Sequence, residues 1–294
     1  MATPTQTPQH TGPSAGTGAA TGDAASAGDA ARTGADGCTG ADGNTEIAGR
    51  KIFFVHPPAW IREDLIYSMV KLGYKTYSTE ESRGLRKLVS LYPGSLLFAN
   101  VDKGPKGFDW LKILSSMNDL FREKDIRLGV LSEDNRKDAI KRYLSAVSAP
   151  CGYIVLTGGQ KEIASRITTQ TVRQKARGRR TQVRARCFDK NATVNVKYAG
   201  ENHAGRVLDI SGAGAACVIP SLDDRLRKDE RMSDIQFKLN SRICTVSGKV
   251  VGIRTESEKT FVLLFDEARS DSVDEKIYAF VKETIQRNFE RAMA

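Results

Sequence analysis

The sequence has few of the residues that build metal centres and catalytic sites. Its 294 residues include five cysteines and three histidines. No two cysteines have the C-x-x-C spacing, and their odd number suits neither a disulfide framework nor a zinc site. The histidines, His10, His56 and His203, are too scattered to predict a metal or general-base cluster. We therefore expect no catalysis, no metal and no cofactor.

Long apolar runs are also missing, since no stretch reaches the roughly 18 apolar residues of a membrane-spanning helix. Residues 1–46 contain no aromatic residue, and they lack the basic start and apolar core of a signal peptide. Their small and polar residues bury too little surface to offset the entropy lost on ordering. We predict a disordered tail over residues 1–46 and a cytoplasmic protein without membrane insertion.

Residues 47–170 alternate between short apolar runs and helical patterns. Strands are expected at 51–55, 75–78, 95–101, 126–131 and 153–156, and helices at 59–72, 82–91, 110–121, 136–146 and from residue 161. This alternation predicts a five-stranded parallel α/β sheet with helices on both faces and right-handed crossovers. The order resembles the receiver domain of response regulators.

The receiver resemblance implies a phosphoacceptor site that these residues do not supply. Such a site needs an acidic pair after the first strand, an Asp after the third and a Lys after the fifth. In this chain the three positions are occupied by His56-Pro57-Pro58, Asn100 and Thr157-Gly158-Gly159. Because an Asn side chain cannot form an acyl phosphate, we interpret the region as a receiver-like pseudodomain. Asp102 is the alternative acceptor.

A basic run follows the last of these helices. The net charge is +10, and residues 173–186 contain no acidic residue but seven cations: Arg173, Lys175, Arg177, Arg179, Arg180, Arg184 and Arg186. Such a run is usually a solvated linker or helix end. It also has the spacing R-x-x-x-R twice, from Arg173 to Arg177 and from Arg180 to Arg184.

A second motif, D-x-S-x-x-G, spans Asp209 to Gly214. Arginine forks bind phosphates and guanine edges, and a carboxylate and a hydroxyl can bind the opposite side of a purine. Together the two motifs therefore predict a ligand site. Taken alone, the second motif also suits a β-turn in which Asp209 and Ser211 bond to their own backbone.

Residues 187–294 read as a second domain. Six strands are expected at 192–198, 206–209, 215–219, 235–239, 243–251 and 261–265, followed by a helix with an apolar stripe from Val273 to Phe289. We expect this stripe to pack on the strands, with a dimer or partner contact as the alternative. With R-x-x-x-R before the first strand and D-x-S-x-x-G at the end of the second, the region resembles the PilZ domain, which binds the bacterial second messenger cyclic di-GMP.

The PilZ resemblance implies a six-stranded antiparallel β-barrel with a C-terminal helix, preceded by a basic linker at residues 171–186. It implies that Arg180 and Arg184 bind the phosphates and the Hoogsteen edges of guanine, with Arg179 as an accessory. Asp209 and Ser211 would bind the base. Gly212 and Gly214 would let the ligand approach the turn closely.

These expectations describe a non-enzymatic cyclic di-GMP receptor. Ligand binding at the linker would reorient the two domains and engage a protein effector, in motility, secretion or related signalling as the family implies. The alternatives are a scaffold that does not bind the nucleotide, a nucleic-acid-binding adaptor and a regulator phosphorylated on Asp102. Nucleic acid is not the expected partner, because no aromatic residues interleave with the basic run to stack on bases. The sequence defines neither the effector nor the oligomeric state.

Overall fold

The computed structural model describes residues 49–255 and 257–294, so the tail predicted at residues 1–46 lies outside the described residues. Its first part is a five-stranded sheet with the order β2-β1-β3-β4-β5, and every neighbouring pair is parallel. The strands are β1 (Ile52–Val55), β2 (Thr76–Thr79), β3 (Leu96–Asn100), β4 (Arg127–Ser132) and β5 (Tyr153–Val155). The predicted parallel α/β sheet is confirmed, and its strand order is the flavodoxin-like order of receiver domains.

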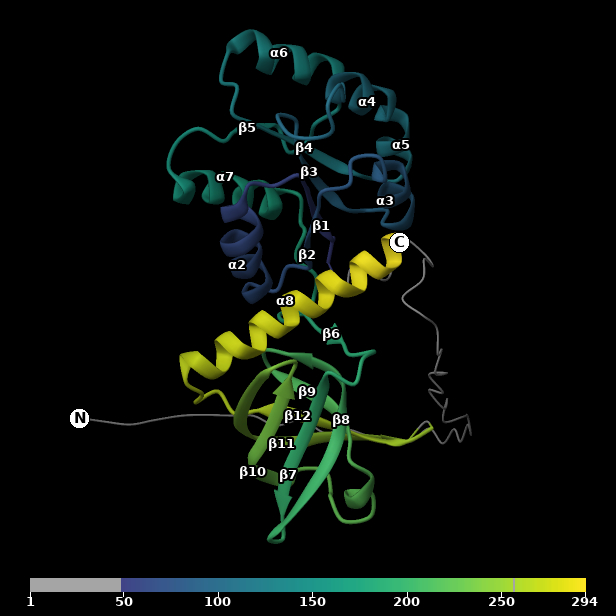
Figure 1. Cartoon of the computed structure of the whole chain (residues 1–294), viewed down its shortest axis with the longest axis vertical. Coiled ribbons are helices and arrows are strands. Elements are labelled where there is room, and N and C mark those ends of the chain that lie inside the picture. The colour runs from purple at the N-terminus through teal and green to yellow at the C-terminus, as the bar shows by residue number, and fades with distance from the viewer. Residues whose placement is uncertain (1–48, 256) are drawn as a thin grey trace, which may run out of the picture. The chain divides into compact units, whose positions relative to one another are not determined.

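Helices cover both faces of this sheet, with α2 and α7 on one face and α3, α4 and α5 on the other (Figure 1). The bounds are η1 (Ile61–Leu65), α2 (Ile66–Lys71), α3 (Leu85–Leu91), α4 (Trp110–Ser116), α5 (Asn118–Glu123), α6 (Lys137–Ala146) and α7 (Gln160–Arg173). The helix expected at 110–121 is two helices, because Met117 has φ −103° and ψ 0°. The helix expected at 59–72 contains the π-helical turn η1. We call the segment from β1 to α7 the α/β part.

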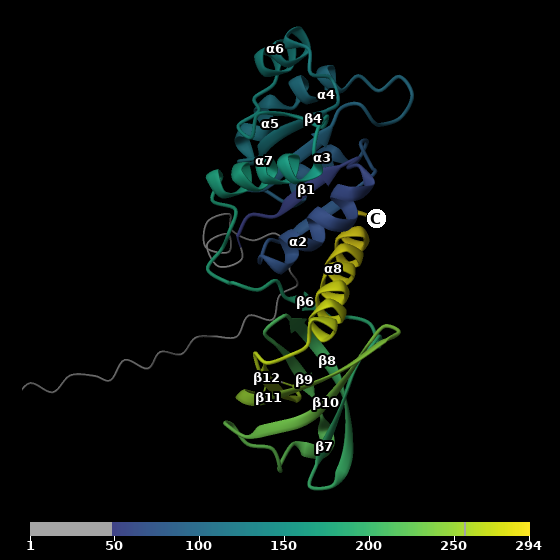
Figure 2. The same cartoon turned by 90° about the vertical axis from the view of Figure 1, so that its left-hand side faces the viewer.

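The second part of the chain is a β-barrel (Figure 2). Its antiparallel strands are β6 (Ala185–Arg186), β7 (Ala192–Tyr198), β8 (Glu201–Ser211), β9 (Gly214–Val218), β10 (Arg231–Leu239), β11 (Arg242–Thr255) and β12 (Lys259–Phe265). They are arranged in the order β6-β8-β7-β10-β11-β12-β9, and an additional β8–β9 pairing closes the six longer strands. The predicted six-stranded antiparallel barrel is confirmed, and β6 is a short seventh strand that the sequence patterns did not indicate.

Two segments of the barrel differ from their predicted extent. β8 begins at Glu201 rather than at residue 206, because the positive φ angles of Ala199 (50°) and Gly200 (87°) form a tight hairpin with β7. β10 begins at Arg231 rather than at residue 235, and the segment from residue 223 to 232 buries Leu226 and Met232. Before it, Pro220–Leu222 forms the short 3₁₀ helix η2.

The last element is the long helix α8 (Asp271–Met293). Its apolar stripe is buried, as predicted, but it does not pack on the barrel alone. α8 contacts β6, β8, β10 and β11 of the barrel and also α2 and β2 of the α/β part. The Phe289 ring lies 5.3 Å from the rings of Phe53 and Tyr77 and 5.9 Å from that of Tyr92. The stripe therefore joins two hydrophobic cores, because its C-terminal end buries an aromatic residue against β1 and β2.

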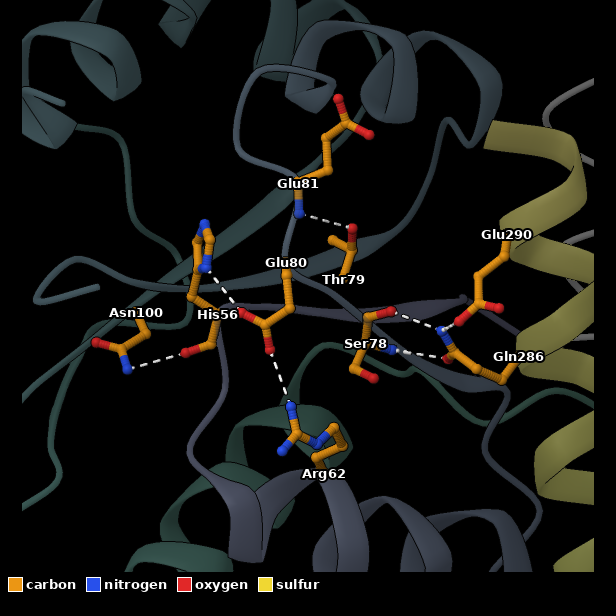
Figure 3. Close-up of polar contacts among 9 residues, drawn as sticks. All are labelled: His56, Arg62, Ser78, Thr79, Glu80, Glu81, Asn100, Gln286 and Glu290. Carbon is orange, nitrogen blue, oxygen red and sulfur yellow. Dashed lines mark hydrogen bonds and ion pairs between the residues drawn. The ribbon is translucent and has the colours of Figure 1, made fainter. Parts of the chain in front are cut away.

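Polar contacts strengthen this junction (Figure 3). The side-chain amide of Gln286 accepts the Ser78 backbone N–H at 3.0 Å and donates to the Ser78 carbonyl oxygen at 2.8 Å. β2 is an edge strand of the sheet, and the two bonds give the Ser78 backbone N–H and C=O the partners that a neighbouring strand would otherwise supply. Lys282 also donates to the Glu63 carbonyl oxygen at 3.0 Å. α8 thus covers the open edge of the α/β sheet.

Candidate ligand site

The short strand β6 brings the two sequence motifs together. It pairs with β8 so that Arg186 lies opposite Asp209. Arg184 directly precedes β6, and Ser211, the last residue of β8, is buried. Alternate residues of a strand share a face, and directly opposite residues share it with their partners. Arg186 therefore lies on the same face of the β6–β8 pair as Asp209.

The arginines of the motif are available to a ligand. Arg179, Arg180 and Arg184 are exposed, and within residues 49–255 and 257–294 their guanidinium groups form no hydrogen bond or ion pair. The other cations of the basic run are exposed as well. An exposed cluster of arginines in a water-accessible segment attracts anions and offers planar donor forks that suit phosphate.

The backbone between Arg180 and Arg184 is fixed although the arginine side chains are exposed. Val183 is buried, and the Gln182 side chain accepts a hydrogen bond from the Tyr278 hydroxyl at 3.0 Å. The Thr181 carbonyl oxygen packs on Gly73, where a Cβ would approach it to 2.4 Å. We call residues 179–184 the arginine segment. Thr181 contacts the α/β part, Gln182 contacts α8 and Val183 lies in the core. Arg180 and Arg184 therefore flank an ordered stretch of backbone.

The D-x-S-x-x-G residues form the tight connection between β8 and β9. The Ser211 hydroxyl donates to the Gly214 carbonyl oxygen at 3.2 Å, which is the turn bond that the alternative interpretation of this motif predicted. Because a hydroxyl has acceptor lone pairs as well as a proton, Ser211 can still accept a hydrogen bond from a ligand. Asp209 is partly exposed beside it.

The two glycines of the motif are required by the protein's own packing. A Cβ at Gly214 would lie 2.1 Å from the Leu263 carbonyl oxygen of β12, and a Cβ at Gly212 would lie 2.2 Å from the Tyr278 hydroxyl oxygen. The Gly212 carbonyl oxygen accepts from Arg269 at 2.8 Å. Close approach of β12 and α8 therefore explains both glycines, and access for a ligand stays a prediction.

Cysteines beside the site are not reactive groups. Cys187 follows β6 and Cys217 lies in β9. Burial, with a smaller contribution from the Asp209 carboxylate, raises the pKa of the Cys187 thiol to about 12. Burial likewise raises the pKa of Cys217 well above its ordinary value. Both side chains remain protonated at neutral pH and act as small apolar residues of the core.

A second polar cluster lies at the carboxyl ends of the α/β strands, where receivers carry their acceptor (Figure 3). The buried Asn100 amide donates to the His56 carbonyl oxygen at 3.0 Å and accepts the Asp102 backbone N–H at 3.1 Å. One Glu80 carboxylate oxygen lies 2.8 Å from His56 Nδ1, and the other accepts from Arg62 at 3.1 Å. Asn100, at the end of β3, thus holds this strand to the residue that follows β1.

The alternative acceptor, Asp102, is also engaged by the protein. Its carboxylate accepts the Ser132 hydroxyl at 2.8 Å and the Glu133 backbone N–H. Over the residues that the structure describes, no group of three or more His, Cys, Asp and Glu side chains could hold a metal ion. In the same residues, no helix combines the length and the apolar character needed to cross a membrane.

Fold and sequence together define the class of each part. Residues 178–283 match the PilZ domain family. The C-terminal part of the chain is therefore a PilZ domain, and it follows an α/β part whose topology is that of a receiver. No curated protein matches the sequence.

Solved structures similar to this chain include proteins of both kinds. The PilZ domain of Escherichia coli YcgR with c-di-GMP is 14% identical, with a TM-score of 0.35 over 39% of this chain and 97% of that one. The K. pneumonia MrkH–c-di-GMP complex is 18% identical, with a TM-score of 0.35 over 40% and 57% of the two chains. The chemotaxis response regulator CheY4 of Vibrio cholerae is 13% identical, with a TM-score of 0.35 over 43% and 98%. The assignment of the PilZ domain depends on the match over residues 178–283.

Several residues at the site had no signal in the sequence. Tyr278 and Asn288 lie on α8, and Arg269 lies just before it. Tyr278 holds Gln182, Arg269 holds Gly212, and Asn288 donates to the Arg186 carbonyl oxygen at 2.9 Å. These contacts join segments far apart in the sequence, so only the spacing of the helix could have suggested that one face of α8 meets the motifs.

Proposed function

We propose that this protein is a non-enzymatic cyclic di-GMP receptor and that the arginine segment with Asp209 and Ser211 forms its binding site. The observation that carries this proposal is the β6–β8 pairing, in which Arg186 lies opposite Asp209 while the exposed Arg184 directly precedes β6. The ligand is a dianion with two guanine bases. It therefore presents both kinds of group that arginine forks bind.

We assign each motif residue a role from its chemistry. Arg180 and Arg184, with Arg179 as an accessory, would bind the phosphates and the guanine O6 and N7 acceptors. Asp209 would accept from the guanine N1–H and exocyclic amine, and Ser211 would accept a further hydrogen bond. Charge-assisted hydrogen bonds contribute roughly 1.5 to 3 kcal/mol each. A few of these, less the cost of association, give the approximately 8 kcal/mol that corresponds to micromolar affinity.

We further propose that the bound ligand changes how the α/β part and the PilZ domain contact one another, and that the new arrangement engages a protein effector in the cytoplasm. The arginine segment supports this idea because it contacts both parts. Thr181 contacts Gly73 of the α/β part, and Gln182 contacts α8. A ligand that binds Arg180 and Arg184 would shift the backbone that carries these two contacts. In this proposal the α/β part is the moving part, and it is not a phosphoacceptor.

Isothermal titration calorimetry with cyclic di-GMP tests the site. Arg180→Ala and Asp209→Ala should each weaken binding at least tenfold, because each removes a charged partner of the ligand. Arg177→Ala is the matched control, since Arg177 is an exposed arginine of the other R-x-x-x-R spacing. Equal losses for Arg177→Ala and Arg180→Ala would show that net charge rather than the motif binds the ligand.

The exposure of all seven cations between Arg173 and Arg186 favours one second candidate, an adaptor that binds nucleic acid. Binding of this kind depends on counterion release and falls steeply as salt rises. Titrations at 50 and 200 mM salt, concentrations over which such binding weakens by roughly 10³ or more, separate the two functions. Tight oligonucleotide binding with that salt dependence, and no response to cyclic di-GMP, would favour the adaptor.

A further inference from the structure

One hydroxyl group lies between the two ligand motifs. The Tyr278 hydroxyl donates to the side-chain oxygen of Gln182, which stands between Arg180 and Arg184. The Tyr278 hydroxyl oxygen also packs against Gly212 of the second motif, where an added Cβ would lie 2.2 Å from it. A single atom of α8 therefore contacts the interior of both motifs.

The surroundings of this hydroxyl keep it in place. Tyr278 is buried, and Lys71 of α2 lies over its ring, 5.6 Å from the centroid. Arg269 donates to the Gly212 carbonyl oxygen and is itself held by Asp274, in the first turn of α8, at 2.9 Å. The N-terminal part of α8 therefore holds both Tyr278 and the turn at Gly212 in position.

We propose that Tyr278 is a positioning residue of the cyclic di-GMP site. It sets the distance between the arginine segment and the D-x-S-x-x-G turn, so that the two walls of the site stand ready before the ligand arrives. This inference rests on the proposed function. Its physical basis is that a site ordered in advance loses less entropy on binding than one that the ligand must assemble.

Tyr278→Phe isolates the hydroxyl from the ring. The ring still packs in the core, but the arginine segment loses its hydrogen bond, and the dissociation constant for cyclic di-GMP should rise about fivefold, the factor for one net hydrogen bond of about 1 kcal/mol. Gln182→Ala should produce a rise of the same size. Because both changes remove the same bond, the double variant should bind no more weakly than the weaker single variant.

Tyr67→Phe is the matched control. Lys71 also lies over the Tyr67 ring, 5.8 Å from the centroid, and the buried Tyr67 hydroxyl has no hydrogen-bond partner in the part of the chain that the structure describes. Its removal makes the same chemical change beside the same lysine without touching a ligand motif. The dissociation constant of Tyr67→Phe should equal that of the wild type.

A readout without ligand separates positioning from general stability. In Tyr278→Phe the backbone amides of residues 181–186 should exchange with solvent faster than in the wild type and in Tyr67→Phe, while the amides of β10 and β11 keep their protection. A hydroxyl with a merely structural role would instead lower protection throughout the barrel and leave the dissociation constant unchanged.

The outcomes are distinct. Wild-type binding with an unchanged dissociation constant in Tyr278→Phe, or additive losses in the double variant, would overturn the positioning role and leave the receptor function standing. No binding by the wild type would refute the receptor function itself, and this inference with it. A shared, non-additive loss together with faster exchange in residues 181–186 is the result expected.

Discussion

Truncating Phe289 to Ala should destabilise the α/β part, although this residue lies at the opposite end of the chain. Phe289 is buried, and its ring contacts the rings of Phe53, Tyr77 and Tyr92. Removing a buried Phe side chain costs about 3 to 5 kcal/mol, through lost apolar burial and the cavity left behind. With a urea dependence of about 3 kcal/mol/M, the unfolding midpoint should fall by about 1 to 1.7 M.

Equilibrium unfolding in urea, followed by tryptophan fluorescence, measures this effect in the right place. The two tryptophans of the chain, Trp60 and Trp110, both lie in the α/β part, so the signal reports that part alone. Phe188→Ala is the control, because Phe188 is 69% exposed and its removal should change the unfolding free energy by less than about 0.5 kcal/mol. An equal midpoint for Phe289→Ala and the wild type would refute the conclusion that α8 completes the α/β core.

Three further predictions concern packing, charge and thiols. Gly214→Ala should destabilise the barrel by several kcal/mol, because its Cβ would meet the Leu263 carbonyl oxygen at 2.1 Å. Gly252→Ala is the control, because its Cβ would make an ordinary 3.6 Å contact with Val262. The thermal midpoint should fall in Gly214→Ala and not comparably in Gly252→Ala, and equal falls would contradict this explanation. Hydrogen bonding from Arg242 lowers the pKa of Glu283, so the pair stabilises the fold above the ordinary glutamate pKa of about 4.3, and that contribution disappears as pH falls through the lowered value. Arg242→Met should therefore lower the thermal midpoint at pH 7 and not at pH 2; an equal loss at both values would assign the effect to packing. Burial raises the pKa of the Cys151 thiol to about 12, so about one such thiol in a thousand is ionised at pH 9. Cys151 should therefore react with a thiol reagent only on addition of denaturant, and fast labelling of Cys151 in the native protein, located by peptide mapping, would contradict its burial.

Local patterns were enough to predict the two architectures. The central strand β1 of the α/β sheet is a continuous apolar run because both of its faces are buried, whereas β10 of the barrel alternates, with Ile235, Phe237 and Leu239 turned inward. β7 has the predicted bounds, Ala192–Tyr198. Arg184 directly precedes β6, which pairs with the strand that ends in the second motif.

Long-range packing produced what the sequence did not reveal. β6 has only two residues, too few for a period to be visible, and its existence depends on pairing with β8. The division of the α8 stripe between two cores, and the contact of Tyr278 with both motifs, require knowledge of which segments meet in space. The N-terminal half of β8 is polar, so the apolar pattern began later than the strand.

The central claim is that the arginine segment and the D-x-S-x-x-G turn form a cyclic di-GMP site, and calorimetric titration of cyclic di-GMP into the wild-type protein tests it most directly. The account predicts saturable binding with a dissociation constant near 1 μM, about 8 kcal/mol, and little heat with GTP at the same concentration. Absence of saturable heat with cyclic di-GMP, or equal binding of GTP, would contradict it.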